Sequence, residues 1–139
     1  MSRILRSASA GLGAALAALV PVAADASGSK LVTASSGPLR ATLTPPARTP
    51  KINTKVPLRV TATLHGKPAH ATALYEFVFA GMVVSTQNPY GKKPYAFTGH
   101  FRDTLDFPAQ AAGQPLTFRV VVKAGGHTVN LNSPVTPRR

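Results

Sequence analysis

Apolar and polar residues alternate along residues 73–86, ALYEFVFAGMVVST, the most apolar run of the chain outside its N-terminus. Tyr75, Phe77 and Phe79 share one parity, which is the period of a strand with one buried face. Ala80 and Gly81 then interrupt the pattern, and glycine tolerates the positive φ that a tight hairpin turn requires. The pattern therefore predicts a β-hairpin, in which residues 82–85 return antiparallel to the first strand.

Similar alternation recurs in shorter segments, at residues 39–44, 56–64, 116–123 and 127–131. Turn residues separate these segments, and Gly125-Gly126 marks a second hairpin. Residues 95–107 are less regular, because Gly99 and Asp103 fall on the inward parity, so we expect a bulge or break near Gly99 and the better strand at 101–107. Seven short strands with frequent turns predict an all-β fold, a two-sheet antiparallel sandwich. Its expected core comprises Leu58, Val60, Phe77, Phe79, Leu105, Phe107, Phe118, Val120 and Val129.

The N-terminus has the features of a secretory signal peptide, expected to form a signal helix over residues 1–26. Arg3 and Arg6 precede an apolar run at 8–24, and Ala24-Asp25-Ala26 fits the small-x-small rule for cleavage. A retained membrane anchor is the alternative, although the run is rich in Ala and Gly and short for a span. We expect a flexible leader at 27–38, the sandwich domain at 39–137 and a basic tail end at 138–139. No transmembrane span is expected after cleavage.

Composition limits how the mature chain is stabilised. Cleavage after Ala26 leaves 113 of the 139 residues, enough for one domain with its own hydrophobic core. The chain contains no cysteine, which excludes a disulfide framework and thiolate metal sites, although a secreted location would permit disulfides. Packing alone must therefore stabilise the domain.

Charge is strongly unbalanced. The whole chain carries a formal net charge of +12, and removal of Arg3, Arg6 and Asp25 with the signal peptide leaves +11. Only Glu76, Asp103 and Asp106 remain acidic in the mature chain. A surface this basic is attracted to anionic wall polymers, anionic lipids and nucleic acid.

The order of the segments resembles a known class of domains. An HGKPA turn precedes the central FVFAGMVV hairpin, and a DFP corner and an LTFRVVV strand follow it. In this order they resemble a bacterial immunoglobulin-like domain, and more narrowly the small secreted single-domain proteins of actinobacterial type. The resemblance covers residues 39–137 and implies an immunoglobulin-like β-sandwich that serves adhesion, spacing or ligand binding, without shared catalytic residues. The Cys–Trp–Cys core of antibody domains is absent, since the chain has neither Cys nor Trp.

One loop combines aromatic and basic residues. Tyr90 and Tyr95 bracket Lys92 and Lys93, and stacking beside cations suits sugars or single-stranded nucleic acid. Two outward strand positions add charge to a candidate polyanion-binding set, which comprises Lys92, Lys93, Tyr90, Tyr95, Arg59 and Arg119. The alternative is a solvated basic loop whose tyrosines cover the edge of the sandwich.

Metal binding and catalysis have less support in the sequence. His65 and His70 flank one turn, and periplasmic copper-binding proteins of the CopC type have an immunoglobulin-like fold, which makes copper or zinc binding an alternative function. Those proteins use a histidine at the mature N-terminus, where this chain has Ser27. A hydrolytic triad needs an orienting carboxylate, and no nucleophile elbow or phosphate loop is present. We therefore expect no enzyme, no cofactor and no resident metal.

The sequence thus predicts a secreted or cell-envelope-associated module that binds or supports rather than catalyses. Anionic cell-wall polymers or a lipid surface are the expected partners, and no specific nucleic acid is expected. Nothing in the pattern fixes the oligomeric state or the particular ligand.

Overall fold

The computed structural model describes residues 30–139, and the signal peptide expected at 1–26 lies outside them. None of the helices in this part of the chain has the length and apolar character needed to cross a bilayer. Its elements are β2 (Val32–Ser36), β3 (Leu39–Thr44), β4 (Val56–Leu64), β5 (Lys67–Pro68), β6 (His70–Phe79), β7 (Met82–Gln87), η3 (Pro89–Gly91), β8 (Tyr95–Thr98), β9 (His100–Leu105), η4 (Ala109–Ala111), β10 (Leu116–Ala124) and β11 (His127–Val135).

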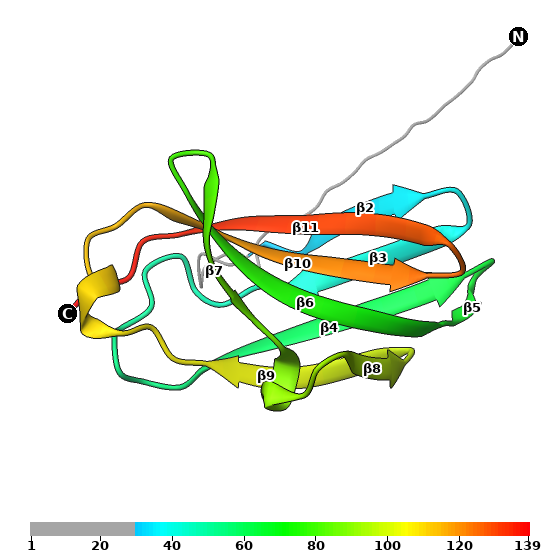
Figure 1. Cartoon of the computed structure of the whole chain (residues 1–139), viewed down its shortest axis with the longest axis horizontal. Helices are drawn as coiled ribbons and strands as arrows, with labels where there is room; N and C mark the ends of the chain where they lie inside the picture. The colour runs from blue at the N-terminus through cyan, green and yellow to red at the C-terminus, as the bar shows by residue number, and fades with distance from the viewer. Residues whose placement is uncertain (1–29) are drawn as a thin grey trace, which may run out of the picture. The chain divides into compact units, whose positions relative to one another are not determined.

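The strands form two antiparallel sheets of five strands each. In the first sheet the order is β11-β10-β6-β7, and β8 also pairs with β6. In the second the order is β2-β3-β4-β5, and β9 also pairs with β4. The sheets face one another across a shared core (Figure 1), which confirms the expected sandwich. Because β2 and β5 were not expected and residues 95–107 form two strands, the described chain has ten strands rather than seven.

The sandwich extends further toward both termini than the sequence predicts. β2 lies within residues 27–38, so the expectation of a flexible leader is wrong for residues 32–36. It pairs with β3, with Val32 opposite Leu43. β11 continues to Val135 and includes Pro134. Because β11 is an edge strand of its sheet, a proline without an N–H group is tolerated there. Leu31–Arg139 forms one compact unit that holds all the described strands and their core, so it contains what it needs to fold by itself.

Gly99 marks the expected break, where the chain passes from one sheet to the other. β8 ends at Thr98 and pairs with β6, whereas β9 starts at His100 and pairs with β4. Gly99 has φ +79°, and its amide donates to the Ala69 carbonyl at 2.9 Å. A left-handed backbone at this residue lets two consecutive short strands belong to different sheets.

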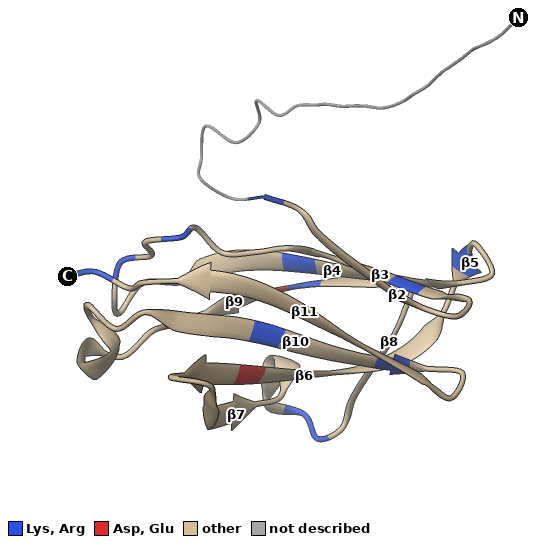
Figure 2. Cartoon of the chain, turned by 90° about the horizontal axis from the view of Figure 1, so that it is seen from above, with Lys and Arg blue, Asp and Glu red and all other residues tan. Residues whose placement is uncertain are grey.

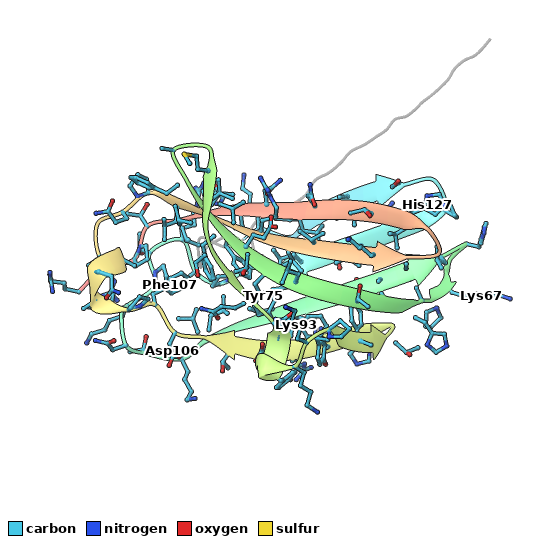
Figure 3. The ribbon with its side chains drawn as sticks, viewed as in Figure 1. Lys67, Tyr75, Lys93, Asp106, Phe107 and His127 are labelled. Carbon is cyan, nitrogen blue, oxygen red and sulfur yellow. The ribbon has the colours of Figure 1, made fainter. Side chains whose placement is uncertain are left out.

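The core is built by the inward parity of the strands, as predicted, with one exception. Phe118 is fully buried, and its ring centroid lies 5.3 Å from that of Tyr75 and 5.4 Å from that of Phe77. Tyr75 and Phe107 lie between the two sheets, whereas Lys67 extends outward at the turn end (Figure 3). Phe79 is the exception: it is 37% exposed, so its assignment to the core is wrong.

One polar link crosses the core between the sheets. The Tyr75 hydroxyl, on β6, donates to Asp103 Oδ2, on β9, at 2.8 Å. Asp103 Oδ1 accepts from the Thr104 amide at 2.8 Å. This explains why an aspartate occupies the inward parity of β9. Burial, followed by the hydrogen bond to Asp103, raises the pKa of the Tyr75 hydroxyl well above its usual value.

Tyr75→Phe is expected to lower the free energy of unfolding by about 1–3 kcal/mol, because the carboxylate loses its cross-sheet donor. Since the pKa of Tyr75 is raised on folding, its contribution is present below the unfolded pKa of about 10 and is lost as pH rises above it. Denaturant unfolding at neutral pH and across the alkaline range measures both effects. The variant should show the smaller alkaline loss of stability. An unchanged stability at neutral pH together with an unchanged alkaline slope would contradict this role.

Candidate binding surface

The loop between β7 and β8 presents an exposed aromatic ring beside two lysines. Tyr90, in η3, has φ +55° and is 57% exposed, and Lys92 and Lys93 are exposed directly after it. Its ring centroid lies 5.4 Å from that of Tyr95. Its hydroxyl donates to the backbone carbonyl of Arg102, on β9. The loop is therefore fastened to the edge strand of the second sheet, and the Tyr90 ring packs at a tilt against that of Tyr95.

Tyr95 has a different position from the one expected of a stacking platform. It is half-buried, and its ring contacts Phe97 at a centroid distance of 6.2 Å and Phe101 at 5.0 Å. Burial raises the pKa of the Tyr95 hydroxyl, and the nearby Tyr90 and Asp103 add to the shift. Tyr95 therefore packs between Tyr90 and the buried rings of Phe97 and Phe101. Tyr90 is the ring that a ligand can reach.

Arg59 joins this loop through a residue that the sequence did not single out. The register of β4 and β9 places Arg59 directly opposite Arg102, and both side chains are exposed. Like charges that face each other across strands repel, so an anion between them is favoured. A shallow hollow of about 310 Å³ beside Arg59 is lined also by Thr61, Thr63 and His100. The loop lies on the side of the first sheet, whereas Arg59 and Arg102 are on the outer face of the second (Figure 2), and the hydrogen bond from Tyr90 to Arg102 links the two. We call Arg59, Arg102, Tyr90, Lys92 and Lys93 together the basic edge, which runs from one sheet to the other.

Arg119 does not belong to the basic edge. It lies on β10, in the other sheet, where its Nη1 forms an ion pair with Glu76 Oε1 at 3.1 Å. Its Nε donates to Asn132 Oδ1 at 2.9 Å. Because Arg59 and Arg119 lie on different sheets, each between two buried residues of its strand, they occupy opposite outer faces. The structure thus places Arg119 on the face opposite Arg59 and gives its charge a partner.

The remaining charge is spread widely and is largely unpaired. Among residues 30–139, the pair between Arg119 and Glu76 is the single ion pair. Every other Lys and Arg of this range is exposed. Figure 2 shows these cations on both sheets and on the connecting loops, with few acidic residues between them. Since Glu76 pairs with Arg119 and Asp103 accepts from Tyr75, little carboxylate is left to offset the positive potential.

The histidines do not assemble a metal centre in the part of the chain that the structure describes. No group of three or more His, Cys, Asp or Glu side chains lies together there. His70 Nδ1 and Thr98 Oγ1 are hydrogen-bonded at 2.8 Å, within the pairing of β6 and β8. His127 packs against Gly37, where a Cβ would meet its Cε1 at 2.8 Å. His70 and His127 therefore contact a threonine and a glycine, neither of which offers a metal-binding imidazole, thiolate or carboxylate.

A second exposed feature was not predicted from the sequence, which assigned Phe79 to the core. The end of β6 and the start of β7 form an apolar hairpin tip, residues 79–84, at which Phe79, Met82, Val83 and Val84 are 37%, 69%, 46% and 57% exposed. Beside it lies a cavity of about 430 Å³, lined on the hairpin side by Phe77, Phe79 and Val84. The connection from β9 to β10 lines the other side, including Pro108 and Ala111. Alternation alone could not show that Phe79 faces this cavity instead of a packed core.

Comparisons with known proteins identify no relative, so the description of the surface rests on its geometry and charge. The chain matches no family model, no curated protein and no solved structure. What the structure defines is a cysteine-free sandwich of two antiparallel sheets. Its described surface carries a basic edge and, separately, an apolar hairpin tip.

Proposed function

We propose that this chain is a secreted or cell-envelope-associated immunoglobulin-like module that attaches to anionic envelope components and catalyses no reaction. The observation that carries the proposal is the basic edge, in which Arg59 and Arg102 face one another without a carboxylate between them. Lys92 and Lys93 add charge, and Tyr90 offers a ring against which a sugar can stack. Two of the three acidic side chains of residues 30–139 already have structural partners.

Attachment of this kind is electrostatic and weakly selective. Phosphate groups along a wall polymer or on a lipid surface offer the same negative charge to the basic edge. Positive potential elsewhere on the domain raises the local concentration of such partners. Of the expected binding residues, we therefore assign Arg59, Lys92, Lys93 and Tyr90 to the contact, and Tyr95 to the support of Tyr90. Copper or zinc binding, the alternative function, is favoured by no observation on residues 30–139.

Retention of residues 27–139 on an immobilised anionic polymer such as polyphosphate tests the proposal. Retention should be strong at about 0.1 M salt and lost toward about 1 M, because the Debye length falls from about 10 Å to about 3 Å. Each exposed charge contact contributes about 0.2–1 kcal/mol, so the double variant Arg59→Gln and Arg102→Gln should bind roughly two- to thirty-fold more weakly.

A matched control removes the same charge elsewhere. Lys67 and Lys123 are exposed, and both lie outside the basic edge, so Lys67→Gln with Lys123→Gln should weaken retention less. Equal losses of retention in the two double variants would contradict a special role of the basic edge, because the net charge of the domain would then account for the binding. No retention at low salt, or retention that salt does not change, would contradict the proposed function.

A further inference from the structure

The apolar hairpin tip concentrates exposed hydrocarbon at one place on the sandwich. Its four large apolar side chains come from six consecutive residues, and Met82 is the most exposed of them at 69%. Ala80 and Gly81 close the turn with φ +52° and +82°, and Phe79 pairs with Met82. Figure 1 shows the hairpin projecting beyond the neighbouring strands. A single exposed apolar residue is ordinary, but a cluster of this kind marks an interaction site.

Exposure on both faces of the tip indicates what kind of partner covers it. Met82 pairs with Phe79 and Val83 with Val78, so Met82 and Val83 point to opposite faces of the strand, and both are exposed. The register shifts between Val83 and Ser85, and the exposed Val84 between them lines the cavity beside Phe79. A protein that added a strand to β7, or packed on one face, would leave the other face in water. A hydrocarbon phase that surrounds the tip covers both faces at once.

The distribution of charge also favours a lipid surface, because β7 is uncharged and two lysines follow it. No charged residue occurs between Glu76 and Lys92, a gap that spans the tip and all of β7. Exposed edge strands are usually protected by lysine or proline, and β7 contains neither. Its far end leads into the loop of Tyr90, Lys92 and Lys93, as the path of β7 in Figure 1 shows. One edge of the sandwich thus carries an apolar end and a cationic end.

We propose that the apolar hairpin tip inserts into an anionic lipid bilayer, while Lys92 and Lys93 contact its headgroups. This inference rests on the proposed function and names the lipid surface as the anionic partner that the β7 edge takes. Insertion is shallow, since β7 is an edge strand and its free backbone groups must stay hydrated or hydrogen-bonded. Residues 79–84 therefore occupy the boundary between headgroups and acyl chains.

Vesicle binding tests the insertion directly. Residues 27–139 are incubated with vesicles of equal parts phosphatidylglycerol and phosphatidylcholine, and binding is compared with that of the double variant Met82→Ser and Val84→Ser. Burying such side chains contributes enough for the variant to bind about tenfold or more weakly. Leu31→Ser is the matched control, because Leu31 is 64% exposed and lies outside the hairpin, and it should bind like the unaltered protein.

A fluorescent reporter gives a second readout. The chain contains no tryptophan, so Met82→Trp introduces a single indole at the tip and Leu31→Trp places one away from it. Emission should shift to the blue on vesicle addition for Met82→Trp alone. Pure phosphatidylcholine vesicles should give a much smaller shift at the same lipid concentration, because the headgroups then carry no net charge.

Polyphosphate separates the failure of this inference from that of the proposed function. If the hairpin variant loses vesicle binding and keeps its retention on polyphosphate, insertion is supported. If the unaltered protein binds polyphosphate but the hairpin variant binds vesicles equally well, the inference is overturned and the proposed function stands. A hairpin-dependent dimer that does not bind vesicles would assign the tip to a second copy and also overturn it. Binding to neither polymer nor vesicles would defeat both proposals.

Discussion

Phe118→Ala is expected to lower the free energy of unfolding by about 3–5 kcal/mol, the cost of removing a buried ring and leaving a cavity. Phe118 is completely buried on β10, and its ring packs against Tyr75 and Phe77. Neighbouring rings on the paired strand cannot move far enough to fill the space, because their own strand is held in register with β10. Such a loss is a large part of the stability of a small domain.

Urea unfolding of residues 27–139, monitored by far-ultraviolet circular dichroism, measures the loss. Thr128→Ala on β11 is the control, since Thr128 is exposed and its replacement should change stability by about 0.5 kcal/mol or less. Phe118→Leu should fall between the two, because it keeps part of the buried volume. A loss below about 1 kcal/mol for Phe118→Ala would show that the two sheets do not pack as described.

Gly99→Val should give the second largest loss of stability, because it combines backbone strain with crowding against a neighbouring residue. A β-branched residue at φ +79° costs about 1–3 kcal/mol in strain. A Cβ at this position would lie 3.2 Å from Pro68 Cβ, and the rigid proline ring can give way only if β5 moves. Overpacking of this kind adds about 1–3 kcal/mol where it is not relieved.

Gly66→Val is the matched control for this prediction. Gly66 has the same φ of +79°, and nothing lies within 4 Å of a Cβ there, so its replacement carries the strain without the crowding. Thermal unfolding of both variants separates the two costs. Gly99→Val should be the less stable of the pair. Equal unfolding midpoints would contradict the crowding, because they would mean that Pro68 moves away from a Cβ at position 99 without loss of stability.

Local alternation was sufficient to predict the strands with one strongly apolar face, including both hairpins. It failed for β2, where small polar residues weaken the pattern and pairing with β3 provides the stabilisation. It also failed for Phe79, which has the inward parity but faces a cavity in place of packed side chains. Parity says which residues share a face, whereas only the arrangement of both sheets says what that face meets.

The binding surface was predictable only in part for a similar reason. Tyr90, Lys92 and Lys93 are neighbours in sequence, so composition alone could group them. Arg102 entered the basic edge through the register of β9 on β4, and Arg119 left it because it lies on the face opposite Arg59 and pairs with Glu76. Which strands pair depends on contacts far apart in the chain, and a single sequence contains no direct signal for them.

The pairing of β6 with β10 has a consequence for how the chain acquires its structure. Tyr75 pairs with Val120, 45 positions later, and Val60 pairs with Phe101, 41 positions later. Such distant pairings slow folding to the millisecond-to-second range, because loop closure precedes the contacts that reward it. Synthesis proceeds from the N-terminus, so β6 and β7 emerge before β10, which pairs with β6. During that interval the uncharged and exposed β7 segment is prone to aggregation.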